Sequence, residues 1–303
     1  MRSPCSPASA ALALSLALAS ALAPTAAHAQ DKKAAPAKPA ATMPAATKPA
    51  AKPAAKGPEP KVDVAPLVKK IRSGDAAQVR EALDEVRIAG PGGVGAAPAI
   101  AEVLGKGLPL PLTESAIETL GDLEAEAGSP AVAPYVGHRN LKVRRAAVKA
   151  LVRTKGAAAA PALRRALSDA DPIVRGTAAS GLGALKAKDS VGDLFVALDH
   201  RVNEAAVSIG QLCDPAQCER LVGKLGPLPF DVVTGGLEQI LFRPTADVSD
   251  DAKVKVVGRL RELGTLEANK FLRDVQKRWP SGTSPRVRQA IDQAVLATAG
   301  GAK

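Results

Sequence analysis

Apolar residues recur every three or four positions along most of the chain after residue 63, the spacing that places them on one face of an α-helix. The pattern is clearest in 157–167 and in 172–185, and no segment shows the sustained alternation of a strand. Between these two runs, Asp171 can serve as an N-cap and Pro172 as a first helical residue. The pattern therefore predicts pairs of short helices joined by tight polar turns.

The same pattern repeats along the chain. The segment 143–151 aligns with 174–182 and with 202–210, so the copies start at closely similar intervals. A second marker, the proline-containing turn around Pro111, recurs around Pro229, and the distance between them is close to four of these intervals. We predict helix pairs at 64–71 with 75–89, 95–104 with 113–125, 129–136 with 141–154, 157–167 with 172–185, 189–198 with 202–212, 215–225 with 230–241, and 250–263 with 266–278, followed by a capping helix at 284–298. One short pair cannot bury its own apolar face, so the pairs must stack. The fold class predicted is all-α, an α-solenoid of about seven to eight antiparallel helix pairs.

The best-preserved copies resemble a known family. Asp169, Val174 and Arg175 fill a D-x-x-x-x-V-R pattern across a turn and the start of a second helix, and His138, Val143 and Arg144 fill it one unit earlier with His in place of Asp. This pattern resembles the short HEAT-like repeats of the phycobilin-lyase type, most strongly over 129–212. The resemblance implies that Asp169, Arg144 and Arg175 are structural, tying turns to helices. Because that family includes scaffolds, lyases and hydroxylases, it leaves the function open.

The segment 1–60 has a different composition. Arg2, an apolar stretch at 8–23 and the Ala-His-Ala sequence at 27–29 are typical of a signal peptide, cleaved after Ala29. The apolar stretch is shorter than the ~20 residues that span a membrane, although an uncleaved signal anchor is the alternative. The segment 30–60, rich in Ala, Pro and Lys, predicts a disordered, extended linker that could also associate weakly with anionic surfaces. The repeat domain is thus 61–303, with no later membrane-spanning helix, and the protein is expected to be periplasmic or secreted.

Composition limits the core and the chemistry. With only six aromatic residues in 303, Ala, Val and Leu must fill the core. The segment 90–95 matches G-x-G-x-x-G but follows a helical segment rather than the strand that a nucleotide site needs, so it predicts a loop between units. The two histidines after residue 29, His138 and His200, lie two units apart, too far to share a metal ion, and are expected to be solvated turn residues. We therefore expect no catalytic residue, no metal and no cofactor.

Charge is unevenly distributed within a net charge of +11. No carboxylate occurs in 127–168, and four basic residues at helical spacing form one stripe. This basic stripe is Lys142, Arg145, Lys149 and Arg153. It could bind an anionic partner, or it could pair with Glu114, Glu118 and Asp122 on the preceding second helix.

Cys213 and Cys218 are the cysteines of the predicted repeat domain. In one continuous helix their Cα atoms would lie ~8.5 Å apart, too far for a disulfide. Asp214 and Pro215 break that helix, and Gln217 could complete a capping box, which brings the cysteines to the two positions of a hydrophobic staple. We predict a disulfide here. The alternative is two thiols packed as small apolar groups, and the C-x4-C spacing disfavours a redox role.

Three functions follow in order of support. The first is a non-catalytic, exported scaffold that presents the solenoid surface to a protein partner. The second is a binder of an anionic envelope polymer or surface through the basic stripe. A lyase-like enzyme comes third, because no reactive constellation is evident. Export and the scarcity of aromatic side chains for stacking argue against nucleic acid as a partner.

Overall fold

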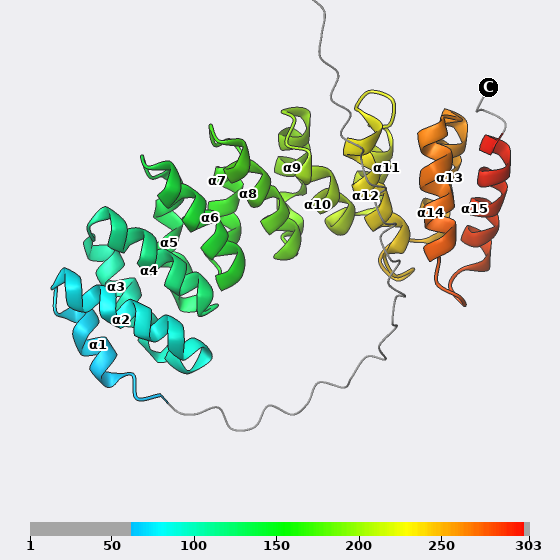
Figure 1. Ribbon diagram of the computed structural model, residues 1–303. Helices are drawn as coiled ribbons and strands as arrows, with labels where there is room; N and C mark the ends of the chain where they lie inside the picture. The colour runs from blue at the N-terminus through cyan, green and yellow to red at the C-terminus, as the bar shows by residue number, and fades with distance from the viewer. Residues whose placement is uncertain (1–61, 300–303) are drawn as a thin grey trace, which may run out of the picture. The chain divides into compact units, whose positions relative to one another are not determined.

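The computed structural model describes residues 62–299, and these residues are helical apart from short connections (Figure 1). The predicted signal peptide and linker lie outside the described residues. The first helices of the pairs are α1 (Ala65–Arg72), α3 (Ala97–Lys106), α5 (Ser129–Val132) with the 3₁₀ helix η3 (Ala133–Gly137), α7 (Ala159–Ala166), α9 (Val191–Asp199), α11 (Pro215–Val222) and α13 (Asp250–Leu263). The second helices are α2 (Ala76–Ala89), α4 (Leu110–Asp122), α6 (Leu141–Thr154), α8 (Pro172–Ala184), α10 (Glu204–Leu212), α12 (Phe230–Phe242) and α14 (Leu266–Arg278). Helix α15 (Pro285–Thr298) follows, and the 3₁₀ turns η1 (Gly90–Ala96), η2 (Glu126–Gly128) and η4 (Lys188–Ser190) lie between pairs.

The helix pairs stack in chain order, which confirms the predicted α-solenoid. Each second helix packs against the next, from α2 through α4, α6, α8 and α10 to α12. Successive second helices run in the same direction, because side chains near the end of α6 reach the end of α4 and side chains near its start reach the start of α8. The turns inside the pairs therefore share one edge of the stack. We number the pairs as units, so that α3 and α4 form the second unit and α9 and α10 the fifth.

Small aliphatic residues form the core, as the composition predicts. Alanine, valine and leucine dominate the buried side chains, and Phe195 is the only aromatic ring among the largest that are fully buried in the described part of the chain. Small residues also let the backbones approach. A Cβ atom on Gly210 would lie 2.1 Å from the carbonyl oxygen of Gly236, so α10 and α12 can pack this closely only because both positions are glycine.

Helix starts follow the predicted capping chemistry. Asp171 accepts a hydrogen bond from the N–H of Val174 at 3.0 Å, and Pro172 is the first residue of α8. Asp214 and Gln217 form the predicted capping box at the start of α11. Of the described helices, none is long and apolar enough to cross a membrane.

Several predicted helices differ from those observed. The helix expected at 215–225 ends at Val222, and the one expected at 189–198 is η4 followed by α9. The helix expected at 113–125 is α4, which starts earlier, at Leu110, because Pro109 and Pro111 occupy its cap and first turn, where no intrahelical donor is required. The single helix expected at 129–136 is instead α5 followed by η3, and the change of helix type falls at Pro134, which lacks the N–H that would continue the α-helix.

Candidate functional site

The turn inside the fourth unit is held to the third unit by an ion pair. Arg144, in the first turn of α6, donates from Nε and Nη2 to the two carboxylate oxygens of Asp169 at 2.7 and 3.1 Å. Asp169 also accepts from the N–H of Asp171 at 2.8 Å, and its side chain is only 8% exposed. The hydrogen bonds that Arg144 donates to Asp169 raise the pKa of the Arg144 guanidinium above its usual value. We call Arg144 and Asp169 the unit clamp.

The same arginine position also holds the turn of its own unit. Arg144 donates from Nη1 to the carbonyl oxygens of His138 and Arg139, at 3.1 and 3.4 Å. Arg175, at the equivalent position of the next unit, donates in the same way to the carbonyls of Asp169 and Ala170, at 2.7 and 3.0 Å. Arg144, Asp169 and Arg175 therefore make the turn-to-helix contacts that the family resemblance implies.

Two residues of the basic stripe form ion pairs with neighbouring units and two do not, within the part of the chain that the structure describes. Arg145 pairs with Asp171 of the following unit, at 2.7 Å, and Arg153 pairs with Asp122 of the preceding unit. Lys142 and Lys149 are exposed and have no ion-pair partner among residues 62–299. The expected pairing with the preceding second helix thus occurs for Arg153, whereas Arg145 pairs with the following unit instead.

Arg145 changes the electrostatics of the turn that it reaches. Its guanidinium donates to both carboxylate oxygens of Asp171, at 3.1 and 2.7 Å, while Asp171 caps α8. These hydrogen bonds hold the pKa of Asp171 below its usual 3.8, against an opposing contribution from partial burial. The third and fourth units are consequently joined by two bidentate arginine–aspartate pairs.

Both histidines lie in turns, and each occupies the position that Asp169 occupies in the fourth unit. His138 precedes α6 and accepts from the N–H of Asn140 at 3.1 Å, as Asp169 accepts from Asp171. His200 follows α9 and is exposed. Within the described range, no three His, Cys, Asp or Glu side chains are grouped so that they could hold a metal ion.

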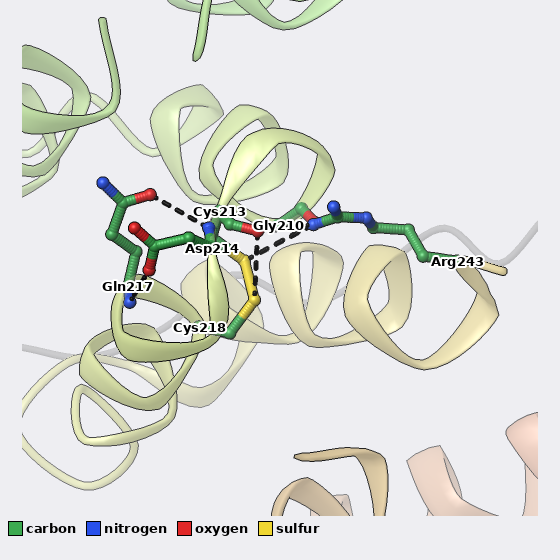
Figure 2. The surroundings of a disulfide bond; sticks show 6 residues. All are labelled: Gly210, Cys213, Asp214, Gln217, Cys218 and Arg243. Carbon is green, nitrogen blue, oxygen red and sulfur yellow. Dashed lines mark hydrogen bonds between the residues drawn. A yellow bond between two sulfur atoms is a disulfide. The ribbon is translucent and has the colours of Figure 1, made fainter. Parts of the chain in front are cut away.

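Figure 2 shows the junction between the fifth and sixth units, where Cys213 and Cys218 form a disulfide. Their Cα atoms are 5.3 Å apart, and both side chains are buried. Arg243, at the end of α12, donates to the carbonyl oxygens of Cys213 and Gly210 at 2.9 and 3.3 Å, so it satisfies the last carbonyl groups of α10. The disulfide therefore joins two consecutive units at a point that Arg243 also holds.

Exposed aliphatic residues follow the edge at which the turns inside the units lie. Leu110, Leu141 and Ile173 stand in the first turns of α4, α6 and α8, and Val196 stands near the end of α9. Ile173 and Val196 are 55% and 56% exposed. We call Leu110, Leu141, Ile173 and Val196 the turn edge. Two grooves open along it, one of about 420 Å³ beside Leu110 and His138 and one of about 490 Å³ beside Val196 and His200.

Sequence reasoning missed the turn edge because it used apolar residues only as markers of the core. The sequence nevertheless contains a signal for this surface. Aliphatic residues outside the core spacing recur at nearly equal intervals at helix starts, beside proline or a polar cap, and they are Leu110, Leu141 and Ile173.

The stacked helix pairs define this protein as a helical-repeat protein. Residues 111–182 match the model of the HEAT repeats, which confirms the predicted resemblance over that part of the chain. No curated protein matches the chain.

Several solved structures are similar in fold. They include the complex of CpcE and CpcF of phycocyanin lyase from Nostoc sp. PCC7120, at 20% identity, covering 82% of this chain and 100% of that one, with a TM-score of 0.41. Human deoxyhypusine hydroxylase is 18% identical over 68% of this chain and 86% of its own, with a TM-score of 0.35. A designed armadillo repeat protein in complex with the peptide (KR)4 is 15% identical over 78% of this chain and 100% of its own, with a TM-score of 0.40. At these values none of them indicates a function for this chain.

Proposed function

We propose that this chain is an exported, non-catalytic scaffold that binds a protein partner along the turn edge. The observation that carries the proposal is the row of exposed aliphatic side chains on four consecutive units. Scattered exposed apolar residues are ordinary on protein surfaces, but a row of them beside two open grooves is typical of an interaction site. Helical-repeat stacks offer such extended surfaces because each unit contributes the same edge.

The disulfide supports the exported location. Disulfides persist in oxidising compartments and are rare where thiols are kept reduced. Together with the signal-peptide pattern at 1–29, the pair formed by Cys213 and Cys218 favours the periplasm or the extracellular space.

Capture from an envelope extract tests the proposal. The full-length chain is immobilised through a C-terminal tag and compared with a variant carrying Ile173→Ser and Val196→Ser. Burying one such aliphatic side chain contributes ~1.5 kcal/mol, so losing two should weaken binding by about a hundredfold. The matched control carries Ile88→Ser and Leu296→Ser, which are 87% and 76% exposed and lie outside the turn edge.

The proposal predicts one set of proteins that the unaltered chain and the control retain and the turn-edge variant loses. Equal retention by all three would show that any binding uses another surface. Retention of nothing by the unaltered chain would contradict the scaffold function itself.

A second candidate, binding of an anionic envelope polymer, is favoured by the two exposed lysines of the basic stripe. Heparin serves as a model polyanion, and the salt concentration that elutes the chain is measured. If this function is correct, Lys142→Gln with Lys149→Gln lowers the eluting salt concentration and leaves stability unchanged, because neither lysine has an ion pair within the described residues.

The matched variant for this test carries Arg145→Gln and Arg153→Gln. It removes the same charge from the same helix but breaks two ion pairs, so it should lower stability modestly and change elution less. Elution that responds equally to both variants, or to neither, would remove the second candidate.

A further inference from the structure

The junction between the fourth and fifth units lacks the unit clamp. Arg144 and Arg175 are separated by the same number of residues as Asp169 and His200. At this junction, Arg175 and His200 therefore occupy the two positions of the unit clamp. The arginine of the clamp is thus kept in the fourth unit, while its carboxylate partner is replaced by an imidazole. At the junction between the second and third units both members differ, because Thr113 stands in place of the arginine and His138 in place of the aspartate. Thr113 still donates to the carbonyl oxygen of Leu108 at 2.9 Å, so it satisfies its own turn without a charge.

Arg175 consequently has hydrogen-bond donors that are not used within its own turn. Its Nη1 is committed to the carbonyls of Asp169 and Ala170. Its Nε and Nη2 have no acceptor among the residues that the structure describes, whereas the same atoms of Arg144 hold both oxygens of Asp169. Nε and Nη2 form the side of a guanidinium that receives a carboxylate in bidentate geometry.

Arg175 lines the groove of about 490 Å³ on the turn edge. Two carboxylates also line it, but each already has a cation. Asp169 is held by Arg144, and Asp193 is held by Arg164, which lies in the groove as well. Among the lining residues, Arg175 is therefore the arginine that has no ion pair within the described part of the chain.

The rest of the lining combines an aliphatic surface with the polar side chains of Ser168 and His200. Leu167 and Ala197 are buried beneath the groove, and Val196 is 56% exposed beside it. A free inorganic anion would use the arginine but leave this aliphatic surface in water. A ligand that carries a carboxylate next to an aliphatic group would use both.

We propose that this groove binds an acidic side chain of a protein partner, Asp or Glu flanked by aliphatic residues, with the carboxylate on Arg175 and the aliphatic side chain against Val196. The partner's carboxylate accepts from Arg175 as Asp169 accepts from Arg144 in the unit clamp. This inference rests on the proposed scaffold function and names the chemistry of the partner segment at one groove of the turn edge.

The probe is the blocked pentapeptide Ser-Leu-Glu-Leu-Ser, compared with the same peptide carrying Gln in place of Glu. Arginine Nε–H resonances of the full-length chain, labelled with nitrogen-15, are followed by NMR as millimolar peptide is added. Arg175→Lys assigns the signal of Arg175. The Glu peptide should shift that signal, since a carboxylate then accepts from Nε, and the Gln peptide should shift it much less. No shift with the Glu peptide at millimolar concentration, or equal shifts with both peptides, would overturn the proposal.

His200→Asp gives a second, independent test, because it restores the carboxylate of the unit clamp. The new side chain should pair with Arg175, weaken binding of the Glu peptide by about tenfold, and raise the thermal unfolding midpoint. Simple misfolding cannot produce that combination. The matched control is His138→Asp, which makes the same change at the equivalent position opposite Thr113 and should alter neither property. Unchanged peptide binding in His200→Asp would contradict the proposal.

The scaffold function and the assignment of a carboxylate ligand to the groove can be contradicted separately. If the unaltered chain retains partners through the turn edge but binds neither peptide, the carboxylate assignment is wrong and the scaffold function stands. If inorganic phosphate or a nucleotide shifts the Arg175 signal and the Glu peptide does not, the groove binds free anions and the assignment to a protein segment is wrong.

Discussion

Asp171 has two roles in the turn ahead of α8. It accepts from the N–H of Val174 as the N-cap, and it accepts from Arg145 of the preceding unit. The second contact lowers its pKa in the folded protein, so protonating it costs more in the folded than in the unfolded chain. The stability that this contact contributes is present above the ordinary aspartate pKa and is lost as the pH falls through the lowered value.

Asp171→Asn separates these roles, because asparagine is also a good N-cap but cannot be charged. The variant should be less stable than the unaltered protein at pH 7. The difference in free energy of unfolding should narrow as the pH falls below about 4, because the aspartate then becomes neutral in the unfolded chain, and it should disappear below the lowered pKa of the folded protein. Urea unfolding across this range measures it, and Arg145→Gln should show the same narrowing. A difference that stays constant with pH would mean that the charge of Asp171 does not contribute.

At the scale of the element, the α10–α11 junction combines a helix break, a capping box and a disulfide. Non-reducing tryptic digestion tests the disulfide directly, because the peptide 202–220 contains both cysteines and no internal Lys or Arg. We expect this peptide to be lighter than the reduced form by two hydrogen atoms and to resist alkylation unless it is first reduced. Alkylation of both cysteines in unreduced, denatured protein would refute the disulfide. Because the closed loop is so short, removing the bond should cost ~2 kcal/mol or less.

Helix α15 closes the described end of the stack by packing against α13 and α14. It also satisfies the buried Asn269, whose Nδ2 donates to the carbonyl of Val295 at 3.0 Å and to Thr298 Oγ1 at 2.7 Å. Deleting the chain from Ser284 onward should therefore promote aggregation, because end units cover the core of a repeat array. Size-exclusion chromatography would contradict the capping role if the truncated chain stayed monomeric and equally stable.

A point variant tests the same role with less disruption. Ile291 is 1% exposed, and Ile291→Ser should lower the free energy of unfolding by about 3 kcal/mol through the cavity and the buried hydroxyl. Leu296 lies on the same helix but is 76% exposed, so Leu296→Ser should change stability by less than about 0.5 kcal/mol. Chemical unfolding that gave both variants the same stability would show that α15 does not pack as described.

Local chemistry made most of these elements predictable. Asp171 with Pro172, and Asp214 with Pro215 and Gln217, mark helix starts in a way that depends only on neighbouring residues. The split at Pro134 and the pairing of Arg145 with Asp171 were harder to predict. The split depends on which backbone N–H groups the helix needs, and the pairing depends on which neighbouring unit the exposed Arg145 side chain reaches.

At the scale of the whole molecule, the repeats explain why the candidate site escaped prediction. The units share one pattern, so the informative positions are those where a unit departs from it, and His200 opposite Arg175 is such a departure. The sequence shows the replacement. Only the arrangement of the described helices shows its consequence. Nε and Nη2 of Arg175 have no acceptor among the described residues, and the exposed Val196 lies beside Arg175 in the lining of the groove.

Hydrogen exchange of the full-length chain, free and bound to a captured partner, tests whether the turn edge is the binding surface. We predict slower exchange in the bound state for segments of the turn edge, 108–113, 138–144, 168–175 and 196–203, with little change in the connections at the opposite edge, 154–158 and 185–190. Protection confined to that opposite edge, or to none of these segments, would show that partners do not bind the turn edge.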